Sequence, residues 1–328
     1  MKSFISQSIA LSLFFLVMTC YHCFAMKMDD RCNNDSEPIC TKSLCVTSGT
    51  AYTDIDALAC AVALAELYNC SAILPGAFNS TIPDSVRRWD FEFSREFSEK
   101  YNSFIIVDVS NPTYFPRHIK REQIVEVFDH HFGFQNYWGS TGKIESVGAC
   151  ATLIFELFKD KRPSTTTANL LYTAIIANTL NFKASVTTQR DISAFEKLKN
   201  FISLPENWVE EYYSEVENKV LEDLEISIKN DTKILGNGWA IAQIELYNPS
   251  ALFSSSKFLD SLWNSMKEHS HWLLTLPSIS EGKNYFVTNS WDIQKVLSEK
   301  VQSNWLGLRG VSDKLYLRKE ILKITNLK

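Results

Sequence analysis

The chain has 328 residues, of which 45% are hydrophobic and 22% are charged, and its formal net charge is −5. This composition is typical of a folded chain with one large domain or two ordinary ones, and it excludes disorder as the main state. Because nucleic-acid-binding proteins usually carry an excess of Lys and Arg, the mild negative charge argues against that class. We therefore expect a folded protein that does not bind nucleic acid.

Residues 1–25 have the pattern of a secretory signal peptide. Lys2 precedes an apolar run over residues 9–18, and a small-residue pattern suited to cleavage ends at Ala25. The apolar run is about half of the ~20 residues that a membrane span needs. An uncleaved anchor is the alternative interpretation. We expect cleavage, and hence a secreted or periplasmic protein without membrane contact once the signal is removed.

A polar segment, residues 26–43, follows the signal and contains Cys32 and Cys40. Once residues 1–25 are removed, no CxxC pair remains in the sequence, which argues against a structural zinc site. We expect at least one disulfide to attach this segment to the next domain, although the sequence does not define the partners.

Strands and helices alternate from residue 44 to residue 203. The expected strands cover residues 44–48, 71–74, 104–109, 124–128 and 144–147. The expected helices cover residues 56–68, 84–99, 149–158, 166–180 and 188–201. This alternation predicts βαβ units, and therefore an α/β fold with a doubly wound, mainly parallel sheet.

The pattern changes after residue 203. Residues 204–225 are charged and helical, which predicts a connector. Residues 226–328 then show strands at 239–246, 272–276 and 285–290, with helices at 254–267 and 292–303. These elements predict a second, smaller domain of the α+β type.

Acidic and histidine side chains follow three of the apolar strands in the first domain. They are Asp54 and Asp56 after the first strand, Asp108 after the third, and Asp129, His130 and His131 after the fourth. The carboxyl ends of parallel strands meet at one edge of a sheet, where ligands bind. Carboxylates gathered there would repel one another without a cation. The cluster therefore predicts a site for Mn²⁺ or Mg²⁺, with one or two ions per chain.

Single members of this cluster also have purely structural interpretations. Asp54 and Asp56 could cap the helix that follows them, and Asp108 could form a turn. A strand that ends in Asp-His-His has no packing explanation, so the joint pattern favours the metal site.

Several segments resemble motifs of the DHH phosphoesterase superfamily. They are residues 49–57, 107–108, 129–131, 147–152 and 174–182. The C-terminal half resembles the DHHA2 branch, which contains manganese-dependent inorganic pyrophosphatases, eukaryotic exopolyphosphatases and prune proteins. The resemblance covers residues 45–322. It implies a DHH metal-binding domain over residues 44–203 and a DHHA2-like domain over residues 226–328 that closes over the substrate.

The resemblance also implies roles for the clustered side chains. Asp54 and Asp56 would each hold one ion, and Asp108 would bridge the two ions. His130 would complete the second site. The side chain of His131 would contact a substrate phosphate, and Asp129 would orient both histidines.

The second domain is implied to bring cations to the substrate. Ser312, Asp313 and Lys314 stand where the pyrophosphatases carry Ser-Arg-Lys, so Lys314 is the first candidate for a phosphate ligand. Arg318 and Lys319 are further candidates.

Three positions depart from the family pattern. Thr50 replaces a histidine that holds one ion in the pyrophosphatases, and Asn178 replaces a metal-binding aspartate. An amide oxygen can still coordinate, as a weak ligand without charge. Asp313 replaces an arginine that faces the substrate. We therefore expect weaker metal binding and slower turnover than in a pyrophosphatase.

The leading expectation is an exported, metal-dependent hydrolase of phosphoanhydride bonds, acting on inorganic pyrophosphate or short polyphosphate. Its partner would be this small phosphate-containing substrate, and the sequence does not define its oligomeric state. The first alternative is a weakened or inactive binding protein of the same family, because of Thr50, Asn178 and Asp313. A phosphodiesterase for small nucleotides is the second alternative.

Overall fold

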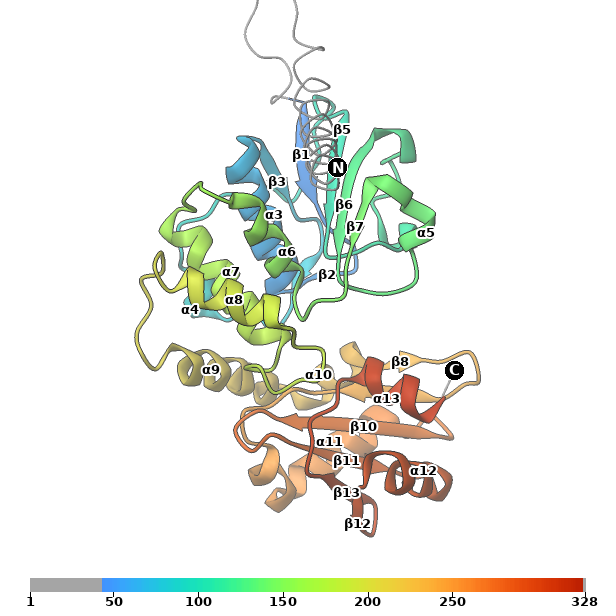
Figure 1. Cartoon of the computed structure of the whole chain (residues 1–328). Helices are drawn as coiled ribbons and strands as arrows, with labels where there is room; N and C mark the ends of the chain where they lie inside the picture. Colours follow the sequence, from blue (N-terminus) through green and yellow to red (C-terminus); the bar gives the residue numbers. More distant parts are fainter. Residues whose placement is uncertain (1–42, 327–328) are drawn as a thin grey trace, which may run out of the picture.

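The computed structural model describes residues 43–326 and contains two large sheets, one in each of two units (Figure 1). The predicted signal peptide, the polar segment up to residue 42, and both Cys32 and Cys40 lie outside the described residues. None of the helices within residues 43–326 is long and apolar enough to span a bilayer.

The first unit is built on a five-stranded sheet in which every neighbouring pair of strands is parallel. In spatial order the strands are β3 (Ser71–Ile73), β1 (Leu44–Thr47), β5 (Ser103–Val107), β6 (Ile124–Asp129) and β7 (Gly142–Ile144). The parallel α/β sheet predicted from the sequence is confirmed. The short strands β2 (Tyr52–Thr53) and β4 (Ala77–Phe78) pair separately.

Alternate side chains of these strands enter different cores. Val46 and Val107 pack in a large cluster under the long helices, whereas Cys45 and Ile106 pack on the opposite face. This is the period-two pattern of a sheet that is buried on both faces. The first face is covered by α3 (Ile55–Tyr68), α6 (Cys150–Phe158), α7 (Thr165–Asn178) and α8 (Gln189–Leu198). The short helices near the other face are η1 (Pro112–Tyr114), η2 (Arg121–Gln123), α5 (Gln135–Trp138) and η3 (Gly139–Thr141).

The prediction of a long helix over residues 84–99 is wrong. Only α4 (Asp84–Arg87) is helical there, and the chain then runs extended beside β3, where Ser94 exchanges backbone hydrogen bonds with Ala72 and Leu74. Trp89, Phe91 and Phe93 all pack against the large core. These aromatic residues alternate at period two, so the segment matches an extended chain better than a helix.

The second unit contains a six-stranded mixed sheet. Its spatial order is β12 (Asn304–Leu306), β13 (Arg309–Ser312), β11 (Lys283–Thr288), β10 (Trp272–Ser278), β9 (Ala240–Gln243) and β8 (Lys233–Ile234). One face packs on α10 (Leu224–Asp231) and α11 (Ser256–Met266), and the other packs on α12 (Trp291–Val301) and α13 (Arg318–Thr325). A 3₁₀ helix, η4 (Pro249–Ser254), precedes α11. The sequence did not predict β8, β12, β13 or α13, because each is short.

The predicted connector forms α9 (Trp208–Glu222), which leads into α10. Trp208, Tyr212 and Tyr213 pack in the core of the first unit, whereas Val220 packs in the core of the second. The helix therefore belongs to both cores.

Further contacts join α13 and the loop after β10 to the first unit. Leu317 packs in the large core of the first unit, and Ser185 hydrogen-bonds to Glu320. The ammonium of Lys183 donates to the backbone carbonyls of Ile279 and Ser280. Figure 1 shows α13 on the side of the second unit that faces the parallel sheet. Side chains of α13 can therefore approach the carboxyl ends of β5 and β6.

Candidate metal centre

Asp56 lies in the first turn of α3 and is completely buried. Its Oδ2 accepts the backbone N–H of Cys150, and its Oδ1 accepts that of Ala151, both at 2.8 Å. Burial, together with the charge of Asp54, raises the pKa of Asp56 to about 7 despite these hydrogen bonds. The first turn of α6 therefore orients a carboxylate that is costly to ionise without a cation.

Asp54 caps the N-terminus of α3. Its Oδ1 accepts the backbone N–H of Ala57 at 2.9 Å, and the residue is half-buried. Asp54 therefore has the helix-capping role that the sequence allowed for it. Its charge nevertheless reaches Asp56 and Asp108, since it contributes to raising the pKa of each.

Asp108 follows β5 in a left-handed backbone conformation, with φ at 57°. Its backbone N–H donates to the carbonyl of Phe128 at 2.8 Å, which holds the turn. Oδ1 of Asp108 is buried and has no hydrogen-bond partner among the described residues. Burial, followed by the charges of Asp54 and Asp56, raises the pKa of Asp108 well above its usual range.

His130 faces this unpartnered oxygen. Its Nδ1 lies 3.2 Å from the carbonyl of Val147, so Nδ1 carries the proton and Nε2 presents a lone pair. Nε2 lies 3.5 Å from Oδ1 of Asp108 and 3.8 Å from Oδ2 of Asp56. Burial, then the charges of His131 and Lys319, lowers the pKa of His130 to about 3. The imidazole is therefore neutral at pH 7.

When Asp56 and Asp108 are ionised, these groups place acceptor atoms against one another with no donor between them. A buried oxygen that lacks a partner is costly, and a neutral imidazole cannot donate from Nε2. A divalent cation beside Asp108 and His130 removes this conflict, and carboxylate and imidazole groups are ligands suited to Mn²⁺. The residues present thus fit the predicted ion.

His131 is held by Asp129 at the rim of this group. Oδ1 of Asp129 accepts from Nδ1 of His131 at 2.7 Å, and it also accepts the backbone N–H groups of His130 and His131. Burial alone would raise the pKa of Asp129, but the hydrogen bond and charge of His131 lower it. The His131 side chain is 54% exposed. Ligand atoms of Asp108, His130 and His131 lie within 4.8 Å of one another.

The three candidate cations of the second unit lie in different surroundings. Lys319 is exposed, and partial desolvation lowers its pKa, while its charge interacts first with Glu320 and then with Asp108, Asp129 and Asp56. By contrast, the guanidinium of Arg318 donates to the carboxylate of Asp231 and to its backbone carbonyl, the latter at 2.7 Å. Lys314 is exposed directly after β13.

The three residues that depart from the family pattern contact other parts of the structure. Thr50 is exposed, and its hydroxyl donates to the carbonyl of Tyr114 at 3.2 Å. Asn178 ends α7, where its Nδ2 donates to the carbonyl of Ala174 at 3.3 Å. Asp313 is 86% exposed and lies 3.7 Å from Lys283.

Backbone groups that support the site could not be identified from the sequence. The carbonyl of Val147 and the N–H groups of Cys150 and Ala151 orient two of the candidate ligands. Residues 147–152 had been identified as a motif, but a backbone donor has no side-chain signal that would reveal its role.

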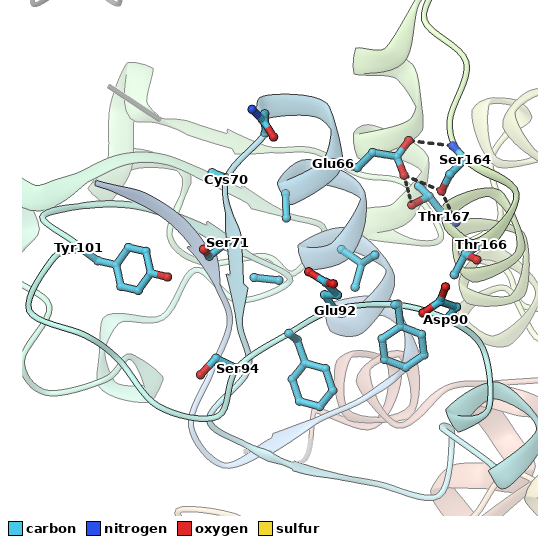
Figure 2. A pocket seen from close by; sticks show the side chains of 16 residues that line it. Glu66, Cys70, Ser71, Asp90, Glu92, Ser94, Tyr101, Ser164, Thr166 and Thr167 are labelled. Atoms are coloured by element: carbon cyan, nitrogen blue, oxygen red, sulfur yellow. Dashed lines mark hydrogen bonds between the residues drawn. The ribbon is translucent and has the colours of Figure 1, made fainter. Parts of the chain in front are cut away.

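A cavity of about 450 Å³ opens at the opposite end of α3 (Figure 2). Its lining includes Glu66, Asp90 and Glu92, and no Lys, Arg or His among the described residues. Because carboxylates repel an anion, this cavity does not suit a phosphate-containing substrate.

Comparison with known proteins agrees with this geometry. Residues 45–175 match the model of the DHH family, N-terminal domain. These residues form a DHH-family domain. The DHH domain contains β1 to β7 and every residue of the candidate metal centre described above, from Asp54 to His131.

Relatives extend the similarity beyond the DHH domain. A protein of Lactobacillus helveticus, named as a probable manganese-dependent inorganic pyrophosphatase, is 24% identical over 278 residues, which cover 77% of this chain and 87% of that protein. The manganese-dependent inorganic pyrophosphatase of Methanocaldococcus jannaschii is 24% identical over 288 residues, which cover 80% and 93%. A crystal structure from Methanococcus jannaschii, assigned to the family II inorganic pyrophosphatases, has a TM-score of 0.66 at 21% identity and covers 86% of this chain and 99% of that chain. The two-unit fold is therefore that of a family II pyrophosphatase.

Proposed function

We propose that this chain hydrolyses a phosphoanhydride bond, in inorganic pyrophosphate or a short polyphosphate, with Mn²⁺ or Mg²⁺ held by Asp56, Asp108 and His130. The observation that carries the proposal is the buried, unpartnered Oδ1 of Asp108 facing the lone pair of His130 Nε2 at 3.5 Å. The relatives named as manganese-dependent pyrophosphatases support the same ion and reaction class.

The ion would supply two things: a water of lowered pKa as nucleophile, and positive charge against the phosphoryl oxygens. The protein's own contribution is to hold three ligand atoms at fixed positions. The Val147 carbonyl orients the imidazole of His130, and two N–H groups of α6 orient Asp56. We propose one or two ions per chain, with Asp54 beside the second position.

His131 is placed to contact the substrate. Its Nδ1 is bonded to Asp129, which leaves Nε2 on the exposed part of the ring. Because Nδ1 carries the proton that bonds to Asp129, Nε2 can donate to a phosphate oxygen only from the imidazolium form, whose positive charge Asp129 stabilises. We propose that His131 binds substrate and that Asp129 positions both histidines.

Lys319 is the candidate in the second unit for the other side of the substrate. Leu317 anchors the start of α13 in the core of the first unit, and Arg318 is fixed by Asp231, so the helix is held beside the carboxylates. Lys314 and Lys319 are both exposed, but the charge of Lys319 acts on Asp108 and Asp129. We therefore propose Lys319 ahead of Lys314 as the phosphate ligand, with residues 226–328 as the DHHA2-like closing domain.

The departures at Thr50, Asn178 and Asp313 determine the affinities for metal and substrate that we expect. A hydroxyl, an amide and an acid stand where the pyrophosphatase pattern has an imidazole, a carboxylate and a guanidinium. Each change lowers the affinity for an ion or for a phosphate anion. We propose a weaker metal site and slower hydrolysis than in a typical pyrophosphatase.

A phosphate-release assay tests the proposal. The wild-type chain, Asp108→Ala and the control Glu66→Gln are incubated with pyrophosphate or tripolyphosphate, in Mn²⁺ or Mg²⁺. The wild type and Glu66→Gln should release phosphate, and Asp108→Ala should release none, because it removes a ligand. If the wild type releases no more than Asp108→Ala from either substrate, the hydrolase proposal is wrong.

Export is a separate proposal that rests on Lys2, the apolar run over residues 9–18 and Ala25. Mass spectrometry of the N-terminus, on protein isolated from its natural host, tests it. We expect a chain that begins at residue 26, and an intact N-terminus would contradict cleavage.

A further inference from the structure

The loop between β7 and α6, residues 145–149, meets two of the candidate metal ligands. The carbonyl of Val147 accepts from Nδ1 of His130 at 3.2 Å. Immediately after the loop, the N–H groups of Cys150 and Ala151 bond to Asp56 at 2.8 Å. A small shift of this loop would therefore turn the imidazole of His130 and move the carboxylate of Asp56 together.

The loop is itself held by a buried carboxylate from α8. Asp191 is completely buried, and its Oδ2 accepts the N–H of Gly148 at 2.9 Å. Its Oδ1 accepts the N–H of Ala149 at 3.3 Å and the hydroxyl of Thr152 at 2.6 Å. Asp191 thus grips both the loop and the first turn of α6.

Asp191 also has an ordinary structural role. It belongs to the capping box of α8, where Oδ2 accepts the N–H and the hydroxyl of Thr188, each at 2.7 Å. The capping box requires only the bond from the Thr188 N–H to Asp191 and the reciprocal bond from the Asp191 N–H to the hydroxyl oxygen of Thr188. The three bonds to Gly148, Ala149 and Thr152 go beyond capping, and they all end on the segment that orients Asp56 and His130.

The packing at Gly148 shows how closely Asp191 fits this segment. A Cβ at Gly148 would lie 3.0 Å from Oδ2 of Asp191 and 2.6 Å from Cγ2 of Thr179. Both distances are shorter than ordinary contacts, so only glycine lets the backbone approach the carboxylate. The loop is therefore clamped between α8 and the end of α7.

We infer that Asp191 is a positioning residue of the metal centre, which acts through the loop to orient His130 and Asp56 without touching the ion. The inference rests on the proposed metal site. Groups that orient metal ligands from outside typically change metal affinity by about 10- to 100-fold when they are removed.

The test is Mn²⁺ binding by the purified chain without substrate, measured from the electron paramagnetic resonance signal of free Mn²⁺. The first variant is Asp191→Asn, in which an NH₂ group replaces one accepting oxygen and faces N–H and O–H donors. The second, milder variant is Thr152→Val. The matched control is Glu66→Gln. Glu66 also caps a neighbouring helix, because it accepts from the N–H and hydroxyl of Ser164 and from the hydroxyl of Thr167 (Figure 2).

We expect Asp191→Asn to weaken Mn²⁺ binding by about 10- to 100-fold and Thr152→Val to weaken it less. Glu66→Gln should leave Mn²⁺ affinity unchanged, although it should lose about as much stability as Asp191→Asn. Wild-type affinity in Asp191→Asn would overturn the inference and leave a capping role only. If Asp191→Asn does not fold, the Mn²⁺ affinity of Thr152→Val becomes the test. An affinity equal to that of the wild type would then overturn the inference. A wild-type chain that binds no Mn²⁺ would overturn the proposed function, and with it this inference.

Discussion

The substitution Asp108→Asn separates stability from metal binding at the centre of the site. Oδ1 of Asp108 is buried without a partner and faces Nε2 of His130, which is also an acceptor, at 3.5 Å. The introduced amide can donate to this nitrogen. The substitution also removes the buried negative charge of Asp108. That charge is unfavourable there, because burial and the neighbouring carboxylates raise the pKa of Asp108. The left-handed φ of 57° suits an asparagine as well as an aspartate.

The expected gain in stability without metal follows from two contributions. A new buried hydrogen bond contributes about 1 kcal/mol, and relief of an unsatisfied buried acceptor contributes about 1–3 kcal/mol. The free energy of unfolding should therefore rise by about 2–4 kcal/mol, which corresponds to about 4–8 °C in Tm for a chain of this size.

Mn²⁺ should reverse the order of the two proteins. An ion at 100 times its Kd adds about 2.7 kcal/mol to the stability of the wild type and more at higher concentration. The variant has lost an anionic ligand and should gain little. Thermal melts at about pH 8, in EDTA and in increasing Mn²⁺, measure both effects. A variant that is less stable than the wild type in EDTA, or that gains as much from Mn²⁺, would refute the reasoning.

Three further predictions concern the ligands and the cations. Because the pKa of Asp56 is raised to about 7, Mn²⁺ affinity should fall by up to about tenfold per pH unit below pH 7. Mn²⁺ binding should also release protons, which calorimetry in two buffers detects. Equal affinity at pH 8 and pH 6 would contradict this prediction. The same raised pKa means that the contribution of Asp56 to the stability of the metal-free protein is present below about pH 4 and is lost as the pH rises through 7. Lys319→Gln should raise KM for pyrophosphate more than the control Lys314→Gln, and equal effects would show that Lys319 does not contact substrate. Thr50→His restores the imidazole of the pyrophosphatase pattern and should tighten Mn²⁺ binding, so unchanged affinity would exclude Thr50 from the ligand positions.

The parallel sheet could be predicted because its side-chain pattern is unambiguous. Leu44 to Thr47 and Ser103 to Val107 are apolar on both faces, as a central strand requires, and each is followed by a carboxylate. The approach of Asp108 to His130 follows from that pattern, since adjacent strands end at one edge.

Other parts of the structure depend on contacts that a local pattern does not contain. The prediction of a helix over residues 84–99 was wrong for a different reason: Trp89, Phe91 and Phe93 alternate at period two, as in an extended chain, and they pack in a core where the ring of Trp208 lies 5.3 Å from that of Trp89. The approach of Lys319 depends on how α13 packs against the first unit. The bonds of Asp191 to Gly148 and Ala149 are made by backbone groups, which every residue carries.

The most direct test of the metal centre is crystal diffraction at the manganese absorption edge from protein soaked in Mn²⁺. The account predicts an anomalous peak in coordination distance of Oδ1 of Asp108, Nε2 of His130 and the carboxylate of Asp56. A crystal with Mn²⁺ bound only elsewhere, or with no peak between these three side chains, would contradict it.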